Sequence, residues 1–337
     1  MSSSLTTHLH PYLTTLLSHL PVPSQKTPIS TPQKALLALL ALLTLRTLSR
    51  LLSRAVVHNF QRPLRRWDNA RELVLLSGGC SGIGKQVMYD FVNAGVKVVI
   101  LDLTEPGFTL PANVTFYKAD VTSPTSLQAV ANEIRTAHGD PTVLINNAGV
   151  GYEGTILAQP ATEIRRTFEV NTLSHFWMVR EFLPAMVRAN HGHVVTIASM
   201  ASFVGLGQMA DYCGSKASAL AFHECLGQEL RLYYKAGKVR ASIVHPLWVR
   251  TPMIKQLTDA GGAFKMPVLT VEVVSRAIVG QVLAQRGGQV ILPGYYSCAR
   301  WLRAMPVWFQ EGVRRVASLQ LKSVVDMREA EEVGVKK

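Results

Sequence analysis

Three side chains that could move a proton stand at a fixed spacing in the second half of the chain: Ser199, Tyr212 and Lys216. Tyr212 and Lys216 are four residues apart in a stretch with helical periodicity, which places them on one helix face. A lysine ammonium beside a phenol lowers the phenol pKa from about 10 toward working pH. Such a phenol can give a proton to a substrate oxygen or take one from it. The hydroxyl of Ser199, at the end of an expected strand, could hold that oxygen.

A glycine-rich turn, SGGCSGIG, covers residues 77–84 between an expected strand and an expected helix. Its glycines let the backbone approach a pyrophosphate, and the helix N-terminus supplies amides and a favourable dipole. Asp102 follows Gly84 by 18 residues, at the end of the next strand, and can accept both hydroxyls of an adenosine ribose. Its charge repels a 2′-phosphate, and no basic residue stands beside Gly82 or just after Asp102 to receive one. The pattern predicts NAD as the cofactor, with NADP left open.

The segment Asn146-Asn147-Ala148-Gly149 and an asparagine in the following helix, Asn171, complete a larger set. In chain order with the glycine turn, Ser199, Tyr212 and Lys216, the set resembles the short-chain dehydrogenase/reductase family over residues 70–295. The resemblance implies an oxidoreductase that transfers a hydride between a nicotinamide cofactor and an alcohol or ketone. Within the family, the membrane-anchored members that act on retinoids, steroids and other lipids look most similar. A hydrophobic small molecule is therefore the expected substrate.

The resemblance also implies a role for each matching residue. Tyr212 would exchange the proton, and Ser199 would bond the substrate oxygen. Lys216 would bond the nicotinamide ribose, and Asn171 would position a water that connects Lys216 to solvent. The family usually has Pro-Gly where this chain has Pro246-Leu247, which leaves the path of that loop open. The expected cofactor contacts are Gly78, Ser81, Gly82, Ile83, Gly84, Asp102, Asp120 (at the adenine), Asn147, Tyr212, Lys216, Val249 and Thr251.

Structural explanations exist for some of the same residues. A tyrosine and a lysine four apart can be mere neighbours on a surface helix, and Asn171 can bend or cap its helix. His191 and His193 could bind a metal, but a surface turn is the simpler interpretation, and we predict no metal site. The alternative function is a membrane or lipid-droplet structural protein that keeps the fold without catalysis. The complete set of residues argues against it.

The elements that must position these residues follow from periodicity after residue 72. Seven short apolar runs alternate with helical stretches, of which 162–186 and 212–234 are the longest. This alternation predicts an α/β fold, a doubly wound parallel sheet of seven strands of the Rossmann type, over residues 70–295. Residues 252–268 are expected to form a substrate lid. The aromatic and basic tail, 296–337, suits a membrane interface, a pocket mouth or ordinary packing. The expected strands are 73–76, 96–101, 114–117, 143–145, 194–197, 239–244 and 289–292.

An N-terminal extension precedes this domain. Residues 1–34 are rich in Ser, Thr and Pro with a short apolar patch, Tyr12–Leu20, and residues 35–45 read ALLALLALLTL. This run gives roughly 17 Å of helix against a hydrocarbon core of roughly 30 Å. Three arginines follow it. We therefore expect a membrane-associated helix over 35–60, lying in the interface or forming a shallow hairpin with the patch rather than simply spanning. Packing of an amphipathic helix on the domain itself is the alternative.

Charge and cysteine usage narrow the partners. The net charge is +13, and residues 1–70 carry eight basic side chains against one acid. These arginines alternate with leucines, which favours anionic lipid headgroups over nucleic acid. The four cysteines show no paired or metal-like spacing and indicate a reducing compartment. We expect a membrane-associated protein that faces the cytosol, at the endoplasmic reticulum or a lipid droplet. The family resemblance also suggests a homodimer.

Overall fold

The computed structural model describes residues 30–63, 65–259 and 264–335, with the side chains of 327–335 left out. The patch Tyr12–Leu20 and the pair Gly261-Gly262 of the expected lid lie outside the described residues. The chain divides into two compact units, residues 1–53 and 54–337.

Helix α2 (Thr31–Val57) contains the apolar run and continues through the three arginines, and none of its residues is buried. It holds an 18-residue window of mean hydropathy 1.8, so by length and composition it could cross a membrane. An apolar N-terminal helix is thus confirmed. Its length is greater than the uninterrupted apolar run suggested.

The expected seven-stranded parallel sheet is confirmed. Its strand order is β3-β2-β1-β4-β5-β6-β9, and every neighbouring pair runs parallel. The order reverses between β1 and β4, the switch point at which doubly wound sheets bind ligands beyond the carboxyl ends of their strands. The strands are β1 (Leu73–Ser77), β2 (Lys97–Asp102), β3 (Val114–Lys118), β4 (Val143–Asn146), β5 (His193–Ile197), β6 (Arg240–Pro246) and β9 (Gly288–Leu292).

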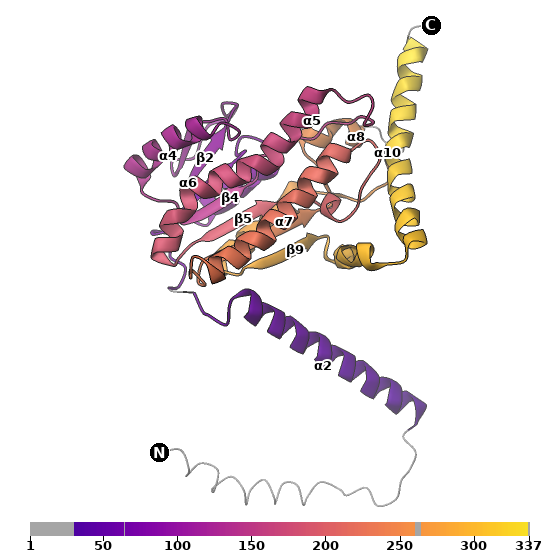
Figure 1. Ribbon diagram of the computed structural model, residues 1–337, viewed down its shortest axis with the longest axis horizontal. Coiled ribbons are helices and arrows are strands. Elements are labelled where there is room, and N and C mark those ends of the chain that lie inside the picture. The colour runs from indigo at the N-terminus through magenta and orange to yellow at the C-terminus, as the bar shows by residue number, and fades with distance from the viewer. Residues whose placement is uncertain (1–29, 64, 260–263, 336–337) are drawn as a thin grey trace, which may run out of the picture. The chain divides into compact units, whose positions relative to one another are not determined.

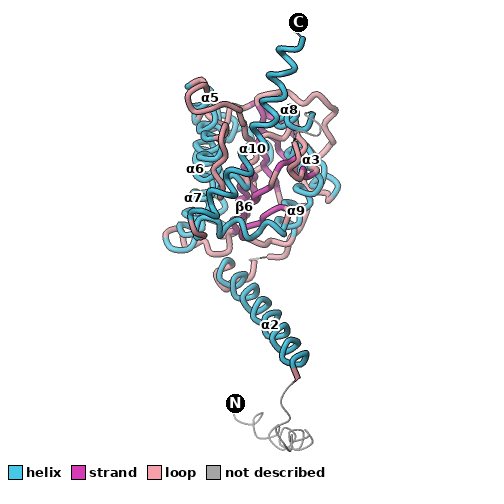
Figure 2. The backbone as a smooth tube through the Cα atoms, turned by 90° about the vertical axis from the view of Figure 1, so that its right-hand side faces the viewer, coloured by secondary structure: helices cyan, strands magenta, loops and turns pink. Residues whose placement is uncertain are grey.

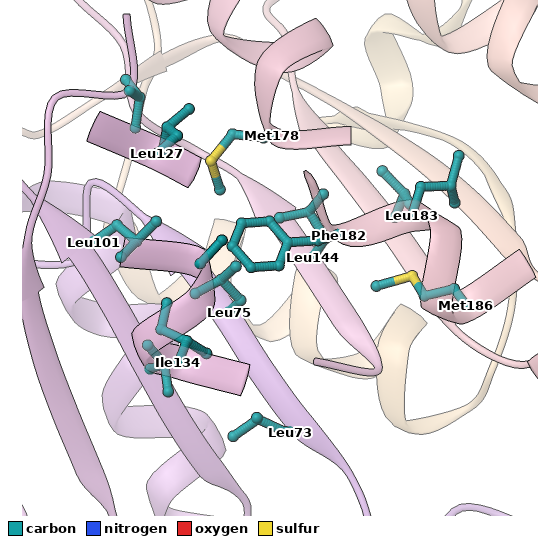
Figure 3. Packing of buried hydrophobic residues seen from close by; sticks show 14 of the residues in the cluster. Leu73, Leu75, Leu101, Leu127, Ile134, Leu144, Met178, Phe182, Leu183 and Met186 are labelled. Carbon is teal, nitrogen blue, oxygen red and sulfur yellow. The ribbon is translucent and has the colours of Figure 1, made fainter. Parts of the chain in front are cut away.

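Helices cover both faces of this sheet (Figures 1 and 2). On one face lie α4 (Pro124–His138), α6 (Ser174–Ala189) and α7 (Ala210–Leu232). On the other lie α3 (Gly82–Asn93) and α9 (Val271–Leu283). Because successive strand residues point to opposite faces, the strands contribute side chains to two cores. Leu75 packs with Phe182 of α6 and Leu144 of β4 in the first core (Figure 3), whereas Leu76 packs with residues of α3 and α9 in the second.

The long helix expected over 162–186 is interrupted. It consists of α5 (Ala161–Phe168), a π-helical turn η1 (Glu169–Leu173) and α6. A single π-helical turn inside a helix frequently marks a functional position, and this one contains Asn171. Helicity in this stretch is confirmed, while the π-turn has no signature in the apolar periodicity.

The expected lid segment is anchored by a separate two-stranded sheet, β7 (Trp248–Val249) with β8 (Val268–Leu269). Between them stand η3 (Pro252–Ile254) and α8 (Lys255–Asp259). The chain ends with the 3-10 helix η5 (Gly294–Ala304) and α10 (Val307–Val335). Leu321 and Val324 of α10 are buried against Ile254, Leu257 and Phe264, so the tail packs on the domain.

Candidate active site

The glycine turn joins β1 to α3 with little room for side chains. Gly78 and Gly82 have φ of +69° and +50°, which glycine adopts without strain. A Cβ on Gly84 would lie 2.0 Å from the carbonyl oxygen of Gly78, and one on Gly82 would lie 3.2 Å from Cγ2 of Thr251. Only glycine fits at position 84. The N-terminus of α3, where the first amides such as that of Ile83 have no partner within the helix, is therefore brought close to the strand end. This is the geometry that a bound pyrophosphate requires.

Asn147 holds the turn from the neighbouring strand β4. Its side-chain Nδ2 donates to the carbonyl oxygens of Ser77 and Gly78, each at 2.9 Å. In return, Ser77 Oγ accepts from the backbone N–H groups of Asn147 at 3.0 Å and Ala148 at 3.1 Å. Ser77 is not among the predicted site residues, although its position at the end of the first expected strand is a signal for it. These bonds fix the two strand ends that flank the switch point.

Asp102 lies at the carboxyl end of β2, beside the glycine turn. Its Oδ2 accepts from the backbone N–H of Cys80 at 3.0 Å, and its Oδ1 accepts from Thr104 N–H at 3.1 Å. Burial raises the pKa of the Cys80 thiol to about 12, with the Asp102 charge adding to the effect, so the thiol stays protonated. A half-buried carboxylate held in this way keeps lone pairs for the ribose hydroxyls and fits the adenosine half of a dinucleotide.

Asp120 follows β3, one residue after Ala119, whose N–H donates to the carbonyl oxygen of Asp102 at 3.0 Å. Asp120 accepts from the N–H and hydroxyl of Thr122 at 2.9 and 2.7 Å and pairs with Arg166 at 3.5 Å. Partial burial alone would raise the pKa of Asp120, but these bonds hold it below the ordinary value. The structure thus brings the two predicted adenosine-side carboxylates to adjacent strand ends.

The proposed proton donor, Tyr212, is in the first turn of α7, and its hydroxyl hydrogen-bonds Ser199. Ser199 follows β5 and caps the short helix η2 (Met200–Ser202), its Oγ accepting from Ala201 N–H at 3.2 Å. Lys216 is buried, with Nζ 5.6 Å from the Tyr212 ring centroid, and it donates to the carbonyl oxygen of Ile197 at 3.1 Å. The predicted trio is therefore assembled in space.

The expected effect of Lys216 on the phenol is wrong for this structure. Burial raises the pKa of Tyr212 to about 12, although the bond with Ser199 acts in the opposite direction. The Lys216 ammonium lies 5.6 Å from the ring centroid, and burial lowers the pKa of Lys216 itself to about 8. Desolvation disfavours the charged form of each group and is the largest cause of both shifts.

Asn171 is buried in the π-turn η1 and bridges two segments. Its Oδ1 accepts from Val150 N–H at 2.9 Å, and its Nδ2 donates to Val150 O at 2.8 Å and to Ser215 Oγ at 3.1 Å. A Cβ on Gly149 would lie 3.4 Å from Asn171 Oδ1 and 3.6 Å from Lys216 Nζ. A side chain at position 149 would therefore be in van der Waals contact with both the Asn171 amide and the Lys216 ammonium.

The remaining predicted cofactor contacts lie at the same carboxyl edge of the sheet. Ser81 is the N-cap residue of α3, and Thr251 stands against Gly82. Val249 is buried in β7. Leu247, the departure from the family pattern, continues the sheet edge because its N–H donates to Leu292 O at 2.8 Å.

His191 and His193 lie at the opposite, amino ends of the strands, away from these residues. His191 pairs with the buried Glu72 at 3.0 Å, and His193 hydrogen-bonds Ser242 Oγ at 2.8 Å. Both therefore have structural partners there.

Known proteins resemble this chain over the same region. The family model described as short chain dehydrogenase matches residues 72–261. The chain is 33% identical over 275 residues to estradiol 17-beta-dehydrogenase 11 of Pongo abelii, covering 79% of this chain and 90% of that protein. It is 43% identical over 199 residues to dehydrogenase RED2 of Cochliobolus heterostrophus, covering 58% of this chain and 75% of that protein.

A solved structure agrees in fold. It is a short chain dehydrogenase/reductase from Burkholderia phymatum in complex with NAD, with a TM-score of 0.62 and 24% identity, covering 71% of this chain and 95% of that one. With the matched glycine turn, strand order and family model, this chain belongs to the short-chain dehydrogenase/reductase family and is an NAD(P)-dependent oxidoreductase that acts on CH–OH groups.

Proposed function

We propose that the protein interconverts a hydrophobic secondary alcohol and its ketone with NAD(H), using Asn171, Ser199, Tyr212 and Lys216. The observation that carries the proposal is the convergence of the Tyr212 hydroxyl, Ser199 and the Lys216 ammonium at the carboxyl edge of the sheet. The glycine turn and Asp102 stand at the same edge. A nicotinamide dinucleotide laid from Asp102 across the turn would end beside Tyr212.

The chemistry divides between the cofactor and the chain. When bound, the nicotinamide ring supplies or accepts the hydride. In reduction, the protonated phenol of Tyr212 gives its proton to the ketone oxygen. In oxidation, Tyr212 must first lose its own proton to solvent, and the phenolate then takes the hydroxyl proton of the alcohol. Ser199 holds the oxygen in both directions through a hydrogen bond. With a pKa of about 8, Lys216 is mostly an ammonium at neutral pH and can donate to the cofactor ribose.

Asp102 supports a preference for NAD(H). It carries a negative charge at the strand end where the adenosine ribose would lie, and its two oxygens are held by backbone N–H groups. A 2′-phosphate there would meet a fixed carboxylate. Lys85, the nearest basic residue after Gly84 in the chain, lies over the Phe108 ring, 4.1 Å from its centroid. NAD(H) is therefore expected to bind more tightly than NADP(H).

The hydrophobic substrate class is supported by α2 and by the relatives. A helix with an exposed apolar surface and three arginines suits a bilayer or a lipid-droplet surface facing the cytosol, as an interfacial helix or as a span. One relative is named an estradiol dehydrogenase, and another, of Homo sapiens, a 17-beta-hydroxysteroid dehydrogenase. Membrane association would bring the enzyme close to such lipid-soluble alcohols. The endoplasmic reticulum, the lipid droplet and a homodimer remain predictions.

The test is turnover of the full-length protein in detergent or lipid with NAD or NADP and a panel of steroids, retinoids and long-chain alcohols. Absorbance of the reduced cofactor reports the reaction. We expect activity with NAD on at least one lipid alcohol, and Asp102→Ala should narrow the difference in affinity between NAD(H) and NADP(H). Equal affinities in the unmutated protein would refute the role of Asp102. A protein that binds neither cofactor would instead support the structural-protein alternative.

A further inference from the structure

His245, near the end of β6, is fully buried and has partners on both sides of its ring. Its Nδ1 lies 3.0 Å from the carbonyl oxygen of Ser199, and its Nε2 lies 3.1 Å from Nε2 of Gln289 in β9. Phe203 packs on the ring, with centroids 4.7 Å apart. The side chain thus connects two outer strands to the backbone of the serine that we assign to the substrate oxygen.

The partners select one tautomer of the ring. An amide NH₂ can only donate, so Nε2 of His245 accepts from Gln289. The proton of the neutral ring is then on Nδ1, which donates to Ser199 O. Burial lowers the pKa of His245 to about 4, which keeps the ring neutral at ordinary pH. Gln289 therefore favours the tautomer whose proton is on Nδ1, the nitrogen that faces Ser199.

This arrangement differs from that of the other deeply placed histidines. His175 has no partner for either ring nitrogen, and His193 and His223 each leave Nδ1 without one among the described residues. An unpartnered buried nitrogen is tolerated at those positions. At His245 both nitrogens are bonded, and one of the bonds ends on Ser199.

Ser199 needs such support because the sheet ends just before it. The β5–β6 register closes at Ile197 opposite Val244, and the last backbone bond between these strands is Ala198 N–H to Val244 O at 2.9 Å. The carbonyl oxygen of Ser199 then accepts one local backbone bond, from Ser202 N–H in η2 at 3.0 Å. Beyond the Ala198–Val244 bond, side-chain hydrogen bonds take the place of strand pairing. Lys216 donates to Ile197 O, and His245 donates to Ser199 O. The backbone is therefore held on both sides of the point from which the Ser199 hydroxyl reaches Tyr212.

We propose that His245 is a positioning residue for Ser199, and that Gln289 holds the imidazole in the tautomer that can donate to the Ser199 carbonyl. The inference rests on the proposed function, because it takes Ser199 as the residue that bonds the substrate oxygen. It adds two residues, from β6 and β9, that act through Ser199.

The first test compares two replacements of the ring. His245→Leu keeps volume and removes the donor, whereas the amide nitrogen of His245→Asn can take the place of Nδ1. We expect kcat of His245→Leu to fall about tenfold, the effect of one lost hydrogen bond, with the NAD(H) dissociation constant unchanged. His245→Asn should recover kcat to within about threefold of the original protein. Equal kcat in both variants, with equal melting temperatures, would overturn the proposal.

The second test reverses the tautomer. In Gln289→Glu, the carboxylate accepts from Nε2–H and raises the His245 pKa, so the ring keeps both bonds only as an imidazolium. The other titratable groups that face the ring are Lys216 and His223 of α7, which both disfavour the cation. We expect kcat of Gln289→Glu to decline with rising pH across a range in which the unmutated protein is flat. The double variant with His245→Asn should lose this decline, and its persistence would count against the proposal.

Two controls separate this inference from the proposed function. Ser199→Ala in the same assay tests the serine itself: if it lowers kcat and His245→Leu does not, the positioning role alone fails. If Ser199→Ala has no effect, the proposed mechanism fails first. Independently of turnover, ¹⁵N NMR of histidine-labelled full-length protein should show that the His245 ring has a protonated Nδ1 and an unprotonated Nε2. In Gln289→Glu, the signals of this neutral ring should give way to those of an imidazolium. A protonated Nε2 at that ring in the original protein would refute the assignment.

Discussion

The two ends of the parallel sheet differ in how their polar groups are used. At the amino end, the buried Arg240 donates to the carbonyl oxygens of His58 at 3.2 Å and Gln61 at 2.8 Å, and His58 Nε2 accepts from Gly287 N–H at 3.0 Å. These bonds join the segment after α2 to the body of the domain. Glu72 and His191 pair with each other at another part of this edge.

At the carboxyl end, the polar groups are fixed by hydrogen bonds and still have donors or acceptors available. Asp102 is fixed by backbone N–H groups and stays half-exposed, and the Lys216 ammonium keeps donors beyond its bond to Ile197. Side-chain bonds at the amino end join segments of the fold, whereas those at the carboxyl end hold the groups that we propose to contact the cofactor and substrate. The comparison predicts that substitutions at the amino end change stability and that those at the carboxyl end change turnover.

The largest expected effect is at the carboxyl end. Tyr212→Phe removes one oxygen and should lower kcat by roughly 10²–10⁴, the usual contribution of a general acid–base residue. NAD(H) affinity and melting temperature should barely change, since the ring and its packing remain. Lys216→Ala should lose both turnover and cofactor affinity. Near-normal turnover of Tyr212→Phe would show that the proton is carried elsewhere.

The opposite pattern is expected at the amino end. Arg240→Met leaves the carbonyl oxygens of His58 and Gln61 without their donor and should lower the free energy of unfolding by about 3 kcal/mol. The kcat of the protein that remains folded should not change. Arg286→Met, an exposed arginine at the same edge, is the control and should cost little. Urea unfolding and turnover at one temperature measure both quantities. A loss of kcat in Arg240→Met would break the division between the two edges.

Titration should also distinguish the edges. At the amino end, burial lowers the pKa of His193 to about 3, with Arg240 adding to the effect. Between pH 3 and about 6.5 the unfolded chain therefore binds a proton that the folded protein does not, and the free energy of unfolding falls as pH falls. His193→Gln, which can keep the bond to Ser242, should reduce this slope by up to about 1.4 kcal/mol per pH unit. Unfolding curves from pH 4 to 7 test it, and an unchanged slope would contradict it.

At the carboxyl end the window is alkaline. Burial lowers the pKa of Lys216 to about 8, so between pH 8 and about 10.5 the unfolded state binds the extra proton and stability rises with pH. Turnover should move the other way and fall above about pH 8, as the ammonium is lost. Parallel measurement of unfolding and kcat from pH 7 to 10 would reveal the divergence. Lys216→Met should abolish the alkaline gain in stability.

The smallest expected effect concerns where the N-terminal segment is cut. Deletion of residues 1–53 and deletion of residues 1–60 both remove the apolar run, and both should release the protein from membranes. Only the longer deletion removes His58, its carbonyl and its bond to Gly287, so it should be less stable by about 1 kcal/mol. Melting temperatures compare the two forms. A truncated protein that still sediments with membranes would place the attachment in the aromatic tail instead.

Most of the fold and the identities of the proposed site residues could be predicted from the sequence alone. Alternating β-branched runs and helical stretches predicted all seven strands, because burial on both faces leaves a continuous apolar signature. The glycine turn and the spacing of Ser199, Tyr212 and Lys216 identified the residues that now converge. Local chemistry was sufficient there, since backbone turns and i, i+4 pairs are set by neighbours in the chain.

The pKa values and the long-range hydrogen bonds of that site depend on the tertiary structure. The pKa of Tyr212 depends on burial, which no spacing reveals, and so the expected lowering by Lys216 was wrong. The π-turn contains Asn171, whose side-chain amide bonds Val150 across the fold. The contact of His245 with Ser199 joins residues 46 apart, through a strand pairing that sets them side by side. Sequence carries the local pattern, whereas desolvation and long-range hydrogen bonds arise only when distant segments meet.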